Sequence, residues 1–249
     1  MTASRARRML LGLLTAALVL VLVAVVGVIA WSRTGVMTAE PGPWGDVVED
    51  PRVTVADSET ALILQPSETG PAETGLVFYP GGKVEPEAYA ARLSPLVTEH
   101  GVTVVIARPT LNLALLDRRG LDTFTASAPE IGTWWVGGHS LGGVRACQVA
   151  PDADGLVLFA AYCANDLSTQ DLPALSLSGS EDALSTPEDI AEHRGNLPEA
   201  ATMLEIDGAN HAGFGDYGAQ RGDGTASLGD EEMDGEVAAA LSEFVAQHT

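Results

Sequence analysis

The sequence has few basic residues, and this shortage limits the partners of the protein. Among 249 residues there are 13 lysines and arginines and 34 acids, so the formal net charge is −21 at pH 7. Lys83 is the only lysine. From Arg52 onward there are 9 basic and 30 acidic residues, and the charge is again −21 (9 minus 30). A surface of this sign repels the phosphates of nucleic acids and anionic lipid headgroups, so we expect no binding of nucleic acid.

Cysteine is equally scarce, since the chain has only Cys147 and Cys163. Their spacing suits neither a zinc site nor a CxxC redox motif, and the sequence predicts no metal site. In an oxidising compartment the two residues can form a disulfide. In the alternative interpretation they are buried thiols that pack as small apolar side chains. The sequence leaves both interpretations open, because a disulfide depends on a distance that the sequence does not contain.

Charge is absent from one long segment near the N-terminus. The run Met9–Trp31 contains 23 residues without a charged side chain, and three arginines precede it. A helix of this length spans about 34 Å, enough to cross a hydrocarbon core of about 30 Å. Arginines that precede such a helix stay in the cytoplasm. We therefore predict a cytoplasmic basic stub (1–8), a transmembrane signal anchor (9–31) that crosses the cell membrane once, and an extracytoplasmic remainder.

A cleaved signal peptide, which would give a secreted protein, is the alternative for this segment. Val28-Ile29-Ala30 loosely resembles a cleavage site with small residues. The apolar run is, however, longer than the roughly 7–15 residues of a typical signal peptide. No cysteine follows the run, which argues against a lipoprotein. The sequence therefore favours an anchor that is embedded in the lipid bilayer.

The rest of the chain alternates between apolar runs and amphipathic segments. Residues 32–51 are rich in Gly, Pro and acids and are predicted to be a linker, and the folded domain is predicted to cover 52–249. The predicted strands are Arg52–Val55, Ala61–Gln65, Gly75–Tyr79, Val102–Ala107, Thr133–Gly137, Gly155–Tyr162, Ala174–Ser178 and Ala201–Ile206. The main predicted helices are Pro86–Glu99, Ser140–Ala150, Pro187–Arg194 and Glu231–Gln247.

This alternation predicts an α/β domain with a mostly parallel central sheet and helices on both faces. Sites in such domains lie at the carboxyl ends of the strands. Only ten residues, Cys163–Leu172, separate the strand Gly155–Tyr162 from the next one. Ten residues are too few for a large cap domain, so we expect an open site with walls made of local loops.

A Gly-x-Ser-x-Gly motif stands where one predicted strand ends and a helix begins. It reads Gly138-His139-Ser140-Leu141-Gly142. In this context the serine sits on a tight turn that raises its hydroxyl above the sheet, and the glycines avoid clashes across the turn. We predict that Ser140 is a nucleophile and that His139 packs under the turn. The alternative is that Ser140 only caps the helix.

A serine hydroxyl needs a base, and the base needs a carboxylate that fixes its tautomer. Of the five histidines, only His211 follows the last predicted strand on a loop at the same sheet edge. Asp182 follows the strand Ala174–Ser178 and is the predicted acid. The order Ser140, Asp182, His211 is the chain order of an α/β-hydrolase triad. Other candidates for the acid are Glu181, Asp207 and Asp216.

Acyl transfer also requires N–H groups that bind the oxyanion. One predicted donor is the backbone N–H of Leu141, the residue after the nucleophile. The other is expected in the loop Tyr79-Pro80-Gly81-Gly82-Lys83, whose glycines allow close approach of a substrate. Either Gly82 or Lys83 would supply it.

With these residues assigned, the chain from about Val53 onward resembles the α/β-hydrolase superfamily. It looks closest to small bacterial hydrolases near the dienelactone-hydrolase and carboxylesterase branch. The motifs that carry the resemblance are Tyr79–Gly82, Gly138–Gly143 and Asn210–Gly218. The resemblance implies Ser140, Asp182 and His211 as the triad, and neither a metal nor an organic cofactor. The dienelactone-hydrolase branch often has cysteine in place of the serine, so its substrate does not carry over.

The sequence thus predicts a serine hydrolase that cleaves carboxylic esters of small-molecule acyl substrates. A thioesterase or an acyltransferase would use the same triad. An alternative from another class is a non-catalytic binding module with this fold. Three acids near His211 could suggest calcium, but their spacing fits no known loop, and we favour a glycine-rich surface loop at 208–229. These acids are Asp216, Asp223 and Asp230.

Overall fold

The computed structural model describes residues 3–67 and 73–248 and contains two compact units, which divide between Val36 and Met37. The first unit is helix α1 (Ala3–Arg33), of which Arg7–Arg33 is long and apolar enough to cross a membrane. Residues 1 and 2 of the predicted stub lie outside the described residues. A signal sequence would have the same composition, so the helix agrees with both interpretations of this segment.

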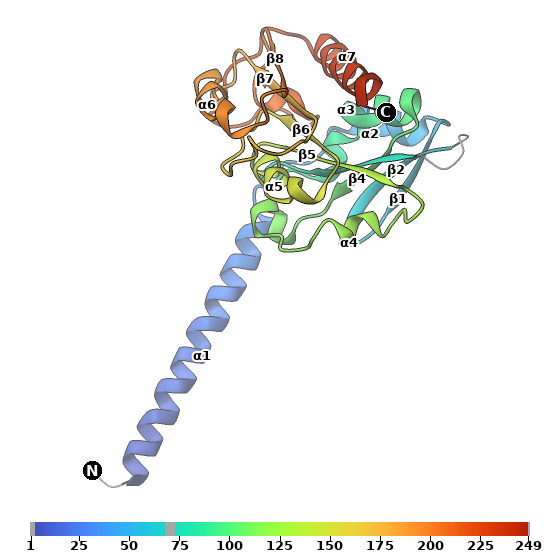
Figure 1. Cartoon of the computed structure of the whole chain (residues 1–249). Helices are drawn as coiled ribbons and strands as arrows, with labels where there is room; N and C mark the ends of the chain where they lie inside the picture. The colour runs from blue at the N-terminus through green and yellow to red at the C-terminus, as the bar shows by residue number, and fades with distance from the viewer. Residues whose placement is uncertain (1–2, 68–72, 249) are drawn as a thin grey trace. The chain divides into compact units, whose positions relative to one another are not determined.

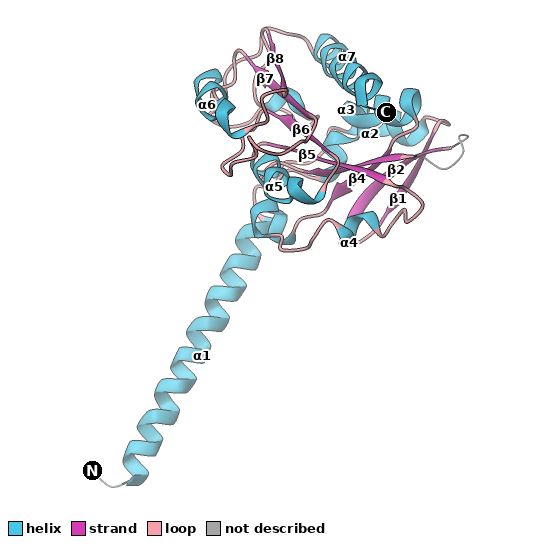
Figure 2. Ribbon diagram, viewed as in Figure 1, coloured by secondary structure: helices cyan, strands magenta, loops and turns pink. Residues whose placement is uncertain are grey.

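The second unit is built on one eight-stranded sheet with the order β1-β2-β4-β3-β5-β6-β7-β8 (Figures 1 and 2). The strands are β1 (Val53–Asp57), β2 (Ala61–Pro66), β3 (Thr74–Tyr79), β4 (Thr103–Ala107), β5 (Thr133–His139), β6 (Gly155–Phe159), β7 (Ala174–Gly179) and β8 (Thr202–Ile206). The first hairpin is antiparallel, β2 also pairs antiparallel with β4, and the remaining pairs are parallel. The predicted fold class is confirmed.

Helices and short 3₁₀ segments cover the two faces of the sheet. The helices are α2 (Pro41–Glu49), α3 (Ala90–His100), α4 (Asp122–Thr125), α5 (Leu141–Val149), α6 (Pro187–His193) and α7 (Asp230–His248). The 3₁₀ segments are η1 (Pro86–Tyr89), η2 (Thr110–Asn112), η3 (Ala114–Leu116), η4 (Ala150–Asp152), η5 (Arg194–Asn196) and η6 (Ala212–Phe214). Residues 160–173, between β6 and β7, form only loops and turns.

Alternation along the strands divides the core into two layers. In β3, Leu76 and Phe78 face the layer that contains α2, α3 and α7, whereas Val77 and Tyr79 face the layer that contains α4 and α5. All four side chains are fully buried. A strand that is buried on both faces has a continuous apolar sequence, which explains why the sequence predicted these strands well.

The predicted linker (32–51) is wrong from Met37 onward, because the second unit begins there and includes α2. Glycines, prolines and acids had indicated a linker. Pro41 and Pro43 lie instead in the first turn of α2, where the missing N–H groups need no partner. Val47 is buried in the core, so this helix is held by packing. The predicted helix Pro86–Glu99 is also divided, since its first turn is η1.

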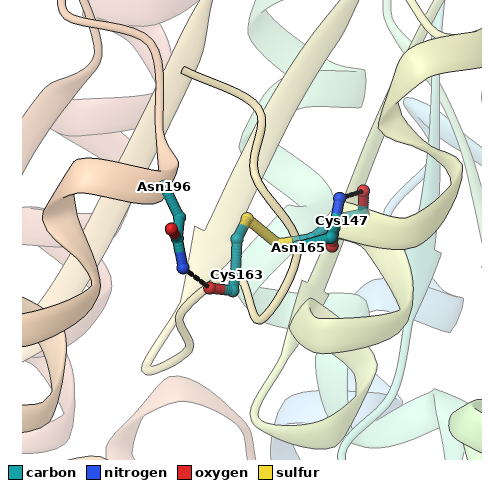
Figure 3. Close-up of a disulfide and its surroundings, with 4 residues drawn as sticks. All are labelled: Cys147, Cys163, Asn165 and Asn196. Atoms are coloured by element: carbon teal, nitrogen blue, oxygen red, sulfur yellow. Dashed lines mark hydrogen bonds between the residues drawn. A yellow bond between two sulfur atoms is a disulfide. The ribbon is translucent and has the colours of Figure 1, made fainter.

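Cys147 and Cys163 form a disulfide that joins α5 to the loop after β6 (Figure 3). Their Cα atoms are 5.4 Å apart. The Asn165 side-chain amide donates to the Cys147 carbonyl at 3.0 Å, and the Asn196 amide donates to the Cys163 carbonyl at 2.8 Å. Both cysteines are fully buried. The disulfide therefore fixes α5 to the loop that follows β6, the strand that pairs with β5.

We expect the double variant Cys147→Ala/Cys163→Ala to lose about 3 kcal/mol of unfolding free energy, because the bond constrains a loop of 16 residues in the unfolded chain. Urea denaturation of the full chain in detergent measures this loss. The same shift should appear when the unaltered chain is unfolded with a reductant, and the reductant should not shift the variant. A shift of equal size in the variant would contradict a stabilising disulfide.

Candidate active site

Ser140 lies on a sharp turn between the end of β5 and the start of α5. Its backbone angles, φ 53° and ψ −123°, are unfavourable for a residue with a side chain. The Ser140 N–H donates to the Phe159 carbonyl at 3.0 Å, which ties the turn to the neighbouring strand β6. The turn places Ser140, half-buried, at the carboxyl edge of the sheet. This geometry agrees with the predicted tight turn, which is called the elbow below. It does not agree with a helix cap, because the Ser140 side chain makes no capping hydrogen bond.

Two glycines make this turn possible because no Cβ fits at either position. A Cβ on Gly142 would lie 2.0 Å from the Tyr79 carbonyl oxygen, and a Cβ on Gly138 would lie 2.5 Å from the Gly142 carbonyl oxygen. The first contact shows that α5 begins directly against the end of β3. The elbow and the loop after β3 are thus adjacent, as the two halves of an oxyanion hole must be.

His211 and Asp182 form a buried hydrogen-bonded pair at the same sheet edge. His211 Nδ1 lies 2.8 Å from Asp182 Oδ2, and both side chains are almost fully buried. Asp182 Oδ1 accepts the backbone N–H groups of Leu184 and Ser185, each at 2.8 Å. These bonds orient the carboxylate toward His211 Nδ1. A neutral imidazole that donates from Nδ1 to this carboxylate presents Nε2 as an acceptor, the form that a general base requires.

The structure does not contain a hydrogen bond between Ser140 and His211. Nε2 of His211 is buried and has no hydrogen-bond partner among the described residues. The centroid of the His139 ring lies 4.5 Å from that of the His211 ring, and His139 is the neighbour of Ser140, so His211 lies beside the turn that carries Ser140. Hydrogen bonds of catalytic groups are often long without substrate and tighten when it binds. The structure thus pairs Asp182 with His211 beside this turn, and the bond between Ser140 and Nε2 belongs to the proposed reaction.

The other candidates for the acid have partners elsewhere. Asp207 accepts a hydrogen bond from Ser180, and Asp216 forms an ion pair with the buried Arg92 at 3.2 Å. Glu181 is exposed, and none of the three bonds to His211. Two of the other histidines also lie outside the site. His100 Nε2 lies 2.9 Å from the Ser242 hydroxyl, and His193 Nδ1 lies 2.8 Å from the Asp189 carbonyl.

The structure distinguishes between Gly82 and Lys83, the two candidate donors in the oxyanion loop that the sequence left open. The Lys83 N–H donates to the Asn112 carbonyl at 2.8 Å, so this group is already used. The N–H groups of Gly82 and Leu141 make no hydrogen bond within the described part of the chain. A Cβ on Gly82 would lie 2.9 Å from Leu141 Cδ1, so the two residues are neighbours. Gly82 and Leu141 are therefore the pair that can bind an oxyanion.

A buried tyrosine, which the sequence analysis did not identify, connects the oxyanion loop to the elbow. The Tyr89 hydroxyl accepts the Gly81 N–H at 2.9 Å and lies 2.9 Å from His139 Nδ1. Burial lowers the pKa of His139 well below its ordinary value, and the nearby His211 lowers the pKa further. His139 is thus neutral, and its Nδ1 can accept a hydrogen bond from the Tyr89 hydroxyl. In the sequence, Tyr89 cannot be distinguished from any other aromatic residue of the core.

We expect Tyr89→Phe to lower kcat by roughly tenfold to a hundredfold, because the loop that carries Gly82 loses its anchor and shifts. The unfolding free energy should fall by about 1–2 kcal/mol, since the Gly81 N–H loses its partner. Tyr217→Phe is the matched control, because among the described residues the Tyr217 hydroxyl bonds only to Gln220, at 3.0 Å. Steady-state kinetics on a soluble ester measure both variants. Equal losses in kcat would contradict a role for Tyr89 in positioning the loop.

Asp223 is a second residue whose place only the structure shows. Its carboxylate accepts the backbone N–H groups of His211 and Ala212, at 3.2 and 2.8 Å. This carboxylate thus holds the histidine loop from the side of the glycine-rich segment. Asp223 binds backbone N–H groups and Asp216 is paired with Arg92, so both acids stabilise the loop that follows β8. No motif in the sequence indicates this role, since Asp223 is one acid among many.

Comparisons with known proteins agree with this fold. The model of the alpha/beta hydrolase family matches residues 75–234, and no curated protein matches the chain. A solved structure, a thermophilic esterase (Est2) from the Planctomycetes species Thermogutta terrifontis, is similar with a TM-score of 0.53. The similarity covers 80% of this chain and 93% of the esterase at 14% identity, so it concerns the fold alone. Since the family model spans most of the second unit, from the oxyanion loop past the histidine, the chain belongs to the alpha/beta hydrolase family.

Proposed function

We propose that the protein is a membrane-anchored, extracytoplasmic serine hydrolase that cleaves carboxylic esters or related acyl bonds. The observation that carries this proposal is the buried pair of His211 and Asp182 beside the strained turn of Ser140. A strained serine, an oriented imidazole and two adjacent free N–H groups are the parts that acyl transfer needs. The apolar helix α1 supports the membrane anchor, and the arginines before it support its orientation.

In the first half of the reaction, Ser140 Oγ attacks the carbonyl carbon of the ester while His211 Nε2 takes the hydroxyl proton. The carbonyl oxygen becomes an oxyanion, which the N–H groups of Gly82 and Leu141 stabilise. Asp182 stabilises the charged imidazole that forms. The bond to the alcohol then breaks, the alcohol takes the proton from Nε2, and an acyl group remains on Oγ.

In the second half, water replaces the alcohol as the attacking group. Nε2 takes a proton from water, the hydroxide adds to the acyl carbon, and the same two N–H groups bind the oxyanion. The bond to Oγ breaks, Oγ recovers the proton and the carboxylic acid leaves. A thiol leaving group would give a thioesterase, and an alcohol in place of water would give an acyltransferase.

A fluorophosphonate probe tests the proposal, because it phosphonylates only a serine that has been activated by a base. We expect mass spectrometry of the full chain in detergent to find one adduct, on the peptide that contains Ser140. Ser140→Ala should prevent labelling, and heat-denatured protein should not be labelled. An unlabelled native protein, or an adduct at another serine, would favour a non-catalytic binding module. Flotation of the membrane fraction and the N-terminal sequence of the mature protein test the anchor separately.

A further inference from the structure

The second unit exposes few large apolar side chains, and half of them gather beside the oxyanion loop. Six are exposed among its described residues: Val48, Leu115, Leu116, Leu141, Leu184 and Leu204. Leu115 and Leu116 lie in η3, which packs against α5, and Leu141 is the first residue of α5. Leu113 joins them, because a Cβ on Gly82 would lie 3.5 Å from Leu113 Cδ2 and 2.9 Å from Leu141 Cδ1. These four leucines are called the leucine rim.

The backbone that carries the leucine rim is held in an unfavourable conformation. Leu111 and Asn112, two consecutive residues with side chains, have φ angles of 58° and 55° in the left-handed region. Such strain persists only where surrounding contacts impose it, and it is concentrated at functional sites. The Asn112 carbonyl of this turn accepts a hydrogen bond from the Lys83 N–H of the oxyanion loop. The exposed leucines are thus projected by a constrained turn beside the oxyanion loop.

Arginines offset the acids beside the leucine rim of this acidic unit. Arg108 forms ion pairs with Asp57 and Glu87, and Arg119 forms one with Asp117. Arg118 follows the exposed leucines and is itself exposed. Leucine side chains next to an arginine suit the boundary between acyl chains and headgroups. Arg118 and the exposed leucines therefore favour contact of the rim with a membrane surface.

A short tether joins α1 to the part of the second unit that is hydrogen-bonded to the loop beside the leucine rim. Met37 follows Arg33, the last residue of α1, by four residues, so their Cα atoms are at most about 15 Å apart. The Met37 N–H donates to the Lys83 carbonyl at 2.7 Å, and the Lys83 N–H donates to the Asn112 carbonyl at 2.8 Å. The short tether thus enters the second unit next to the loop that carries the rim.

We propose that the leucine rim contacts the outer surface of the bilayer that holds α1 and admits lipid-borne acyl esters directly to Ser140. The inference rests on the proposed function for its substrate class, whereas the membrane contact rests on exposure, charge and the tether. An ester with a long acyl chain leaves the bilayer unfavourably, because its apolar surface becomes exposed to water. A rim that is inserted beside the oxyanion loop avoids that exposure.

The membrane contact is tested with the full chain in phosphatidylcholine vesicles that contain brominated acyl chains. Bromine quenches the fluorescence of an indole at acyl-chain depth, and Leu116→Trp places an indole on the rim. The signal of the new indole is the fluorescence of the variant minus that of the parent chain. We expect bromolipid to lower this difference by about half. Leu204→Trp is the matched control, since Leu204 is similarly exposed on the edge strand β8, and its added fluorescence should be unchanged. No quenching at 116, or equal quenching at both positions, overturns the proposal.

The substrate class is tested with 4-methylumbelliferyl oleate in the same vesicles and 4-methylumbelliferyl acetate in solution. We expect Leu115→Asp/Leu116→Asp to hydrolyse the oleate about tenfold more slowly, because two leucines no longer enter the membrane. Fluorophosphonate labelling of Ser140 and turnover of the acetate should stay within about twofold. Leu204→Asp should change neither activity. Equal losses on both esters, or no loss on either, overturn the proposal. An unlabelled parent chain would instead refute the proposed function, and the quenching result would still decide the membrane contact.

Discussion

Ser140→Ala and His211→Gln are each expected to lower kcat by about a million-fold, and the double variant is expected to lose no more than either one. The reason is that the hydroxyl and the imidazole act as a unit, since the serine is unreactive without the base and the base has no other proton to take. The turnover that remains should come from the N–H groups of Gly82 and Leu141 and from substrate binding. Steady-state rates on a soluble ester measure all three variants.

His100→Gln is the control for this prediction. His100 bonds to Ser242 between α3 and α7, on the far side of the core from the site. Its replacement tests whether the loss of any partly buried histidine lowers the activity. We expect kcat to stay within about twofold of the parent value. Losses that multiply in the double variant would mean that the two residues act independently, which contradicts the proposed mechanism.

The second large effect is expected at the carboxylate, where Asp182→Asn should lower kcat by about ten thousand-fold. Asp182 Oδ1 accepts two backbone N–H groups, so the oxygen of an asparagine must stay at that position. The asparagine NH₂ then faces His211 Nδ1, which has to become an acceptor. The proton moves to Nε2, and the nitrogen that should take the serine proton is already protonated. The variant should therefore fold normally and be almost inactive.

Asp207→Asn is the matched control for the carboxylate. Asp207 directly follows β8, and its carboxylate accepts a hydrogen bond from Ser180 at 3.3 Å without reaching His211. We expect this variant to keep kcat within about twofold. Circular dichroism and urea denaturation establish that both variants are folded. If Asp182→Asn kept a tenth of the parent activity, the hydrogen bond between Asp182 and His211 would be structural and not part of catalysis.

The sequence predicted each strand to within a few residues, and five of the eight, β3 to β7, are mostly apolar and buried on both faces. It was wrong about residues 37–51, which belong to the folded unit and contain α2. Proline is typical of both a linker and the first turn of a helix. What distinguishes them is the packing of Val47 on the core, which depends on residues that are far away in the chain.

For the candidate site, chain order was sufficient to choose Ser140, Asp182 and His211, since the carboxyl ends of parallel strands meet at one edge. The sequence could not decide between Gly82 and Lys83 for the oxyanion donor. That choice depends on whether the Asn112 carbonyl, some thirty residues later, occupies the N–H of Lys83. The roles of Tyr89 and Asp223 were missed because neither residue belongs to a motif, and their partners lie 8 to 50 residues away along the chain.

The sequence by itself determined the apolar helix, the alternation of strands and helices, and the order in which the reactive residues follow the strands. These properties follow from short stretches of sequence or from the order of residues along the chain, so hydrophobic periodicity and turn residues predict them. Only the tertiary structure decided which donors and acceptors are free and which are already used, including the two free N–H groups beside Ser140 and the pairing of Asp182 with His211. A hydrogen bond joins specific atoms at about 3 Å, and the folded chain alone brings residues that are tens of positions apart to that distance.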